Sequence, residues 1–169
     1  MTATLHRRAL IGALIGAAAP VSAGAQERDV LSAMPLDQHG WSAAATPPDG
    51  LGWNVLGATR SEERTIDGFS MLLPIFTPRV RALAGRRVRV NGFMLPLEET
   101  PRQSRFLLMA YPTSCPFHLS VGAEFCIDVR AAAPVPVTYD AFQMEGVFTL
   151  LERDPEGLFY RMTDARMVR

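Results

Sequence analysis

The sequence predicts a mainly β protein: a small five-stranded OB-like barrel with one short helix and an N-terminal extension. From Arg87 onward, apolar and polar residues alternate with a period of two in five separate segments. Gly, Pro and Asp residues interrupt the pattern between these segments. Five short strands after one helical segment are typical of a small barrel, for which the OB-fold is the natural candidate, and a two-sheet sandwich is the alternative.

The helix is expected between Thr77 and Gly85. Thr77 is a favourable N-cap, Pro78 is favoured at the first helical position, and Gly85 is a typical stop. The compact domain is expected to begin before this helix, at residue 51. Its first apolar residues are expected in the core: Trp53, Val55 and Leu56.

The five strands are expected at residues 87–97, 105–111, 124–130, 142–153 and 158–168. Gly92 in the first strand indicates a bend or a bulge. Residues 131–135 contain a proline and are expected to form a connection after the third strand. In that third strand, Ile127 and Val129 should occupy one face and Cys126 the other.

Residues 1–25 are expected to be a signal peptide. Arg7 and Arg8 precede an apolar run at residues 9–21, which is too short to span a bilayer comfortably, and an Ala-Gly-Ala cleavage pattern follows. The paired arginines fit both a Sec signal and a twin-arginine signal, so either export route is open. We therefore expect a periplasmic protein with no membrane span after cleavage.

The mature chain is expected to contain a linker or ordered tail at residues 26–50 and a single barrel domain at residues 51–169. The whole chain has 17 basic and 17 acidic residues, and cleavage removes two arginines and no acidic residue. The slightly acidic mature chain therefore gives no electrostatic reason to expect binding to nucleic acid or to an anionic membrane. The expected partner is an envelope protein such as a transporter component, and the oligomeric state stays open.

The chemistry of this chain is expected at Cys115, His118 and Cys126, which include its only two cysteines. The Cys-x-x-His spacing lets two side chains in a tight turn point at one ion, and a hairpin could bring Cys126 beside them. These three ligands fit Zn²⁺, while thiolates also suit Cu(I), with Met94 or Met109 as a thioether ligand. A non-catalytic accessory protein that handles a transition metal is the leading interpretation.

Two alternatives use the same cysteines. A Cys115–Cys126 disulfide would act as a staple in a protein-interaction module, because an even cysteine count in an exported chain favours pairing. A thiol-redox protein is the other alternative, since His118 could lower the pKa of Cys115. A hydrolase that uses Ser114, His118 and Asp128 is disfavoured, because the chain has no Gly-x-Ser-x-Gly elbow.

Several motifs together resemble the bacterial exported family of unknown function numbered 3299. They are Gly85-Arg-Arg-Val-Arg-Val-Asn-Gly-Phe-Met-Leu-Pro-Leu-Glu98, Phe106-Leu-Leu108, Cys115, and the opening Trp53-x-Val-Leu56. The resemblance covers residues 51–169 and implies an OB-like barrel and an envelope location, without an established activity. This chain departs from the common pattern: two residues separate Cys115 from His118, where many relatives have one, and Ser120 to Ala123 replace a proline run.

Overall fold

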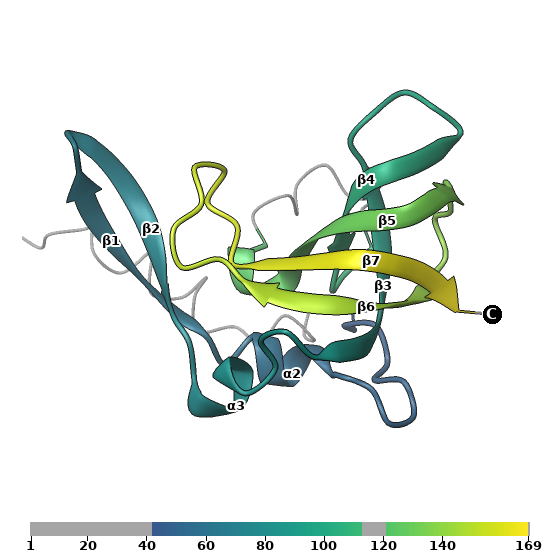
Figure 1. The fold of residues 1–169 in the computed structure, drawn as a ribbon, viewed down its shortest axis with the longest axis horizontal. Helices are drawn as coiled ribbons and strands as arrows, with labels where there is room; N and C mark the ends of the chain where they lie inside the picture. The colour runs from purple at the N-terminus through teal and green to yellow at the C-terminus, as the bar shows by residue number, and fades with distance from the viewer. Residues whose placement is uncertain (1–41, 113–120, 169) are drawn as a thin grey trace, which may run out of the picture. The chain divides into compact units, whose positions relative to one another are not determined.

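The computed structural model describes residues 42–112 and 121–168 and confirms the mainly β class. Five strands close a barrel in the order β3-β4-β5-β7-β6 (Figure 1). Neighbouring strands are antiparallel, except that β5 and β7 run parallel. The strands are β3 (Arg87–Pro96), β4 (Arg102–Met109), β5 (Cys126–Pro136), β6 (Phe142–Leu150) and β7 (Tyr160–Val168).

The predicted helix is present as α3 (Pro78–Arg81), with the predicted cap. The Thr77 side chain accepts a hydrogen bond from the Val80 N–H at 3.3 Å, and Gly85 adopts a φ of 74°, a conformation that favours glycine. The prediction of a single helix was wrong, because a second short helix, α2 (Trp53–Leu56), precedes it. Its buried face consists of the apolar residues expected in the core.

The prediction that residues 131–135 form a connection was wrong, because these residues belong to strand β5. The strand continues to Pro136, and Val135 and Pro136 pair with Gln103 and Arg102 of β4. The register shifts between Gln103 and Arg105, so the proline at position 134 falls in the irregular part of the ladder. An irregularity of this kind removes the need for a ladder N–H, which is why the strand can contain a proline.

A two-stranded hairpin that the pattern did not reveal precedes the barrel. It consists of β1 (Arg60–Ile66) and β2 (Phe69–Ile75) and forms a sheet of its own (Figure 1). Asp67 and Gly68 form its turn, with φ values of 53° and 84°. Asp-Gly is the expected signal for such a type I′ turn, and it was available in the sequence.

Gly92, where a bend or a bulge was predicted, is the residue at which β3 changes its pairing partner. Residues up to Gly92 pair with β6, and residues from Phe93 onward pair with β4. A Cβ atom at Gly92 would lie 2.8 Å from the carbonyl oxygen of Met109 and 2.7 Å from the Leu108 side chain. The two backbones approach so closely that a larger residue would push β4 away.

Residues 42–51 are hydrogen-bonded to the barrel. The Ala44 N–H donates to the Ala110 carbonyl at 2.8 Å, and the Leu51 N–H donates to the Arg89 carbonyl at 2.7 Å. The Asn91 side chain donates to the Ala45 carbonyl at 2.8 Å. The Leu51 contact satisfies a carbonyl in the part of β3 that pairs with β6 alone, and the Ala44 contact satisfies a carbonyl just after β4.

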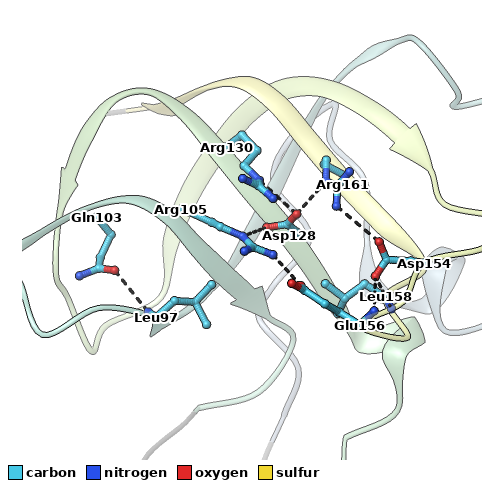
Figure 2. Close-up of polar contacts among 9 residues, drawn as sticks. All are labelled: Leu97, Gln103, Arg105, Asp128, Arg130, Asp154, Glu156, Leu158 and Arg161. Atoms are coloured by element: carbon cyan, nitrogen blue, oxygen red, sulfur yellow. Dashed lines mark hydrogen bonds and ion pairs between the residues drawn. The ribbon is translucent and has the colours of Figure 1, made fainter.

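A buried glutamine organises the connection between β3 and β4. The side-chain oxygen of Gln103, which is fully buried, accepts a hydrogen bond from the Leu97 N–H (Figure 2). It accepts a second one from the Glu98 N–H. Its amide nitrogen donates to the carbonyls of Glu98 and Thr100. The Gln103 side chain therefore supplies hydrogen-bond partners for the backbone groups of this turn.

Inward-facing residues of all five strands fill the barrel, which explains the period of two in the sequence. The fully buried ones include Val90, Met94, Phe106, Leu108, Ile127, Val129, Met144, Phe148, Tyr160 and Met162. Tyr160 also joins the barrel to α2 and to the residues that follow it: its hydroxyl donates to the Leu56 carbonyl at 2.8 Å and shares a 2.6 Å hydrogen bond with the Thr59 hydroxyl. Burial raises the pKa of this phenol to about 12.

We expect Tyr160→Phe to lower the free energy of unfolding by about 1–2 kcal/mol, because it leaves the Leu56 carbonyl and the Thr59 hydroxyl without this buried partner. Urea denaturation measures the change. Tyr139→Phe is the matched control, since Tyr139 is 80% exposed and its replacement should have no measurable effect. Equal stability of the two variants would contradict the role of the Tyr160 hydroxyl.

Candidate functional site

The outward-facing side chains of β4 and β5 form one surface of the barrel. Alternation turns Phe106 and Leu108 into the barrel and leaves Arg105, Leu107 and Met109 outside. On β5, Ile127 and Val129 point inward, as predicted, and Cys126, Asp128 and Arg130 lie outside. We call these six outward residues the β4–β5 outer face.

Asp128 lies at the centre of this face, fully buried although it points away from the core. Three arginines from three strands surround its carboxylate (Figure 2). The Arg105 Nε donates to Oδ1 at 3.0 Å, and the Nε atoms of Arg130 and Arg161 donate to Oδ2 at 3.2 and 2.7 Å. Arginine supplies these donors because its guanidinium stays charged and can bind several acceptors at once.

Two acidic residues of the β6–β7 connection extend the cluster. The Arg105 Nη2 donates to the Glu156 carboxylate at 2.6 Å, and the Arg161 Nη2 lies 3.6 Å from Asp154 Oδ1 (Figure 2). Asp154 in turn accepts hydrogen bonds from the N–H groups of Glu156 and Leu158. Three carboxylates therefore balance three guanidinium groups, and the connection is fixed to the outer face.

The arginines keep Asp128 ionised despite its burial. Burial by itself raises the pKa of this carboxyl, but hydrogen bonds from Arg161 and Arg105 and the charge of Arg130 together hold its pKa below the ordinary value of 3.8. The arginines occupy the carboxylate oxygens, so Asp128 is not placed to act as a general base.

A pair of sulfur-containing side chains lies at the end of the same face. Cys126 of β5 is the direct partner of Met109 of β4 in the antiparallel register. Directly opposed residues project from the same side of a sheet, with Cβ atoms about 4.5–5.5 Å apart. Cys126 is 5% exposed and Met109 is 6% exposed, and neither belongs to the main core cluster.

The environment of Cys126 favours the protonated thiol. Burial, and secondly the negative charge of Asp128, raise the pKa of this thiol to about 12. A thiol with such a pKa is a poor nucleophile at neutral pH, since the thiolate is the reactive form. A metal ion could still bind it by displacing the proton.

The other two predicted site residues, Cys115 and His118, lie outside the described residues. The structure therefore tests neither the proposed metal ligands nor the Cys115–Cys126 disulfide. Within residues 42–112 and 121–168, no group of three His, Cys, Asp or Glu side chains is arranged to hold a metal ion. Of the two methionines considered as thioether ligands, Met109 lies beside Cys126, whereas Met94 points into the barrel core.

The arginines at the start of β3 belong to a separate surface. A depression of about 560 Å³ lies beside them, next to the segment at residues 49–51. Arg89 binds Glu145 at 2.7 Å, and Arg87 forms an ion pair with Asp164. This strand thus presents a solvated face with cross-strand ion pairs rather than a row of free cations.

Comparison with known proteins shows a similarity to one solved structure. No protein-family model and no curated protein matches this chain. Among solved structures, it is similar to the crystal structure of a DUF3299 family protein from Pseudomonas aeruginosa PAO1, with 24% identity, 54% of this chain and 67% of that chain covered, and a TM-score of 0.40. That is the family which the sequence motifs resemble. Function must therefore be argued from this chain's own residues.

The structure adds one observation on membrane association. Among the described residues, no helix is both long enough and apolar enough to cross a bilayer.

We expect Asp128→Asn to lower the free energy of unfolding by about 1–3 kcal/mol, because a buried neutral amide, whose NH2 group cannot accept hydrogen bonds, replaces the carboxylate that three arginines share. Thermal denaturation at pH 7 measures the loss. Asp164→Asn is the matched control: Asp164 is an exposed partner of Arg87, and removing such a surface pair should cost about 1 kcal/mol or less. Similar losses for the two variants would contradict a central role for Asp128.

The same variant should change the acid response. A carboxyl with a lowered pKa in the folded state contributes stability that is present above its ordinary value of 3.8 and is lost as the pH falls through the folded value. The stability of the natural chain should therefore decrease below about pH 4, and that of Asp128→Asn should decrease less steeply. Parallel slopes for the two proteins would show that other carboxyl groups carry the acid dependence.

Proposed function

We propose that this protein is a non-catalytic accessory module of the periplasm that handles a transition metal, with Cys115, His118 and Cys126 as ligands. The observation that carries the proposal is the cross-strand pair of Cys126 and Met109 on the β4–β5 outer face. A thiolate and a thioether are soft ligands, so the pair favours Cu(I) over Zn²⁺. The partner that would receive or supply the metal is an envelope protein such as a transporter component.

The raised pKa of Cys126 gives this site a specific property. The metal must displace a proton from Cys126, so its apparent affinity should increase with pH over the neutral range. Asp128 does not compete for the ion, because three arginines occupy its oxygens. Its negative charge adds to the effect of burial in raising the pKa of the Cys126 thiol.

The test is an anaerobic titration of the mature chain with Cu(I) against a chromophoric chelator, repeated with Zn²⁺. We expect one Cu(I) per chain. Cys126→Ser and His118→Ala should abolish tight binding, and Met109→Leu should weaken it about tenfold, equivalent to ~1.4 kcal/mol. Met167→Leu is the matched control, since this β7 methionine is 42% exposed and lies away from the pair. Unchanged Cu(I) affinity in Cys126→Ser and Met109→Leu would refute the site.

A disulfide-stapled interaction module is the second candidate, and the burial of Cys126 favours it. Cys126 is buried and its thiol resists ionisation. Both properties suit a structural disulfide, because the sulfur atoms of a disulfide carry no charge. The bond to Cys115 would close a loop of ten intervening residues and stabilise the domain by about 2–3 kcal/mol. The thiol-redox alternative depends on a low pKa at Cys115, which lies outside the described residues; Cys126 itself has neither the exposure nor the low pKa of an attacking thiol.

Intact mass of the exported mature chain, with and without thiol alkylation under denaturing conditions, separates these candidates. A disulfide predicts a mass lower by two hydrogens and no alkylation before reduction. Two thiols that are alkylated after denaturation, together with a metal adduct in the native spectrum, would support metal handling. His118→Ala adds a control, because a stapled module should tolerate this change and a metal site should not.

A further inference from the structure

We propose that the free edge of β2 is a dimerisation surface, on which β2 of a second copy of this chain pairs antiparallel about Leu72. The hairpin of β1 and β2 forms a two-stranded sheet, and no described strand pairs with either of its outer edges. A two-stranded hairpin is only marginally stable in water unless another strand or surface covers it. The inference is independent of the proposed metal site, because Cys126 and Met109 lie on barrel strands.

The turn determines which backbone groups face outward. In a two-residue type I′ hairpin, the residues that flank the turn, Ile66 and Phe69, form a hydrogen-bonded pair, and bonded and non-bonded pairs then alternate. Phe69, Met71, Leu73 and Ile75 therefore direct their backbone groups toward β1. Every second residue between them directs its backbone groups to the free edge: Ser70, Leu72 and Pro74.

Charge distinguishes the two edges of the hairpin. β1 carries four charged residues, Arg60, Glu62, Glu63 and Arg64, and charged side chains are a common protection of an edge strand. β2 carries no charged residue, and its sequence is apolar except for Ser70. The protection of this edge is limited to the missing N–H of Pro74.

The apolar side chains of β2 are exposed as well. Phe69 is 74% exposed, Leu72 is 44% exposed and Ile75 is 47% exposed. They lie at the two ends and in the middle of one seven-residue strand. Burial of such side chains at an interface provides the driving force for association.

A second copy is the occupant that fits this edge. With Leu72 opposite Leu72, an antiparallel pair of β2 strands places Phe69 opposite Ile75 of the second copy and Met71 opposite Leu73. These pairs are apolar, the remaining pair is Ser70 with Pro74, and no like charges meet across the two-fold axis of this isologous interface.

The hydrogen bonds of this arrangement tolerate the proline. The Leu72 N–H of each copy would donate to the Leu72 carbonyl of the other, and the Ser70 N–H would donate to the carbonyl of Pro74. Only the donor that Pro74 lacks would be missing, and it would be missing symmetrically in both copies. The result is a four-stranded sheet in which β1 of each copy forms a charged outer edge.

Sedimentation velocity of the mature chain over a range of concentrations tests the proposal. We expect a monomer–dimer equilibrium. Leu72→Lys places two like charges against each other at the axis and should raise the dimer dissociation constant at least about tenfold. Thr65→Lys is the matched control: Thr65 lies on β1 of the same hairpin, opposite Ser70, so the variant should dimerise like the natural chain.

Amide hydrogen exchange provides an independent readout. The N–H groups of Leu72 and Ser70 should exchange more slowly as the protein concentration rises, and this effect should be lost in Leu72→Lys. Circular dichroism of both variants verifies the fold before either measurement. A natural chain that stays monomeric at high concentration would overturn the proposal, as would a dimer that Leu72→Lys leaves intact.

Discussion

The buried carboxylate of Asp128 is the interaction on which the outer side of the barrel depends. A buried charge is strongly destabilising unless it is paired, and here the pairing takes arginines from β4, β5 and β7. A slip of one residue in any of these strands would turn its arginine into the barrel, so the cluster opposes alternative registers. The parallel contact between β5 and β7, in which Asp128 is paired with Arg161, brings the last of these donors into place.

The cluster around Asp128 also influences Cys126, the described residue of the proposed metal site. Cys126 is two residues from Asp128 on the same face of β5, so the strand that carries the buried carboxylate also fixes the position of the thiol. Burial, and secondly this carboxylate, raise the pKa of Cys126, and the neighbouring strand places Met109 beside it. One short stretch of paired strand thus determines the charge, the burial and the sulfur partner of this cysteine.

The proposed metal site and the proposed dimerisation surface lie on different elements and depend on different interactions. The pair of Cys126 and Met109 lies on a rigid closed barrel, where neighbouring strands restrict each side chain. The β2 edge belongs to a hairpin whose backbone groups on one side have no partner among the described strands. A closed barrel removes edges, whereas an added hairpin creates them, so association is expected at the hairpin and ligand chemistry at the barrel.

The sequence alone was sufficient for the parts of this protein that depend on local pattern. Alternation predicted all five barrel strands, and Thr77 and Gly85 predicted the ends of a helical segment. The hairpin could also have been found, because Asp67-Gly68 is a turn signal, but the charged residues of β1 do not alternate with apolar ones and obscured it.

The tertiary structure decided what depends on residues far apart in the chain. Asp128 was visible as a lone acidic residue in an apolar strand, yet only the closed barrel brings Arg105 and Arg161 to it, because both belong to other strands. Likewise, the sequence named Met94 and Met109 as equivalent thioether candidates. The register of β4 against β5 selects Met109, since direction relative to the core is a property of the paired sheet.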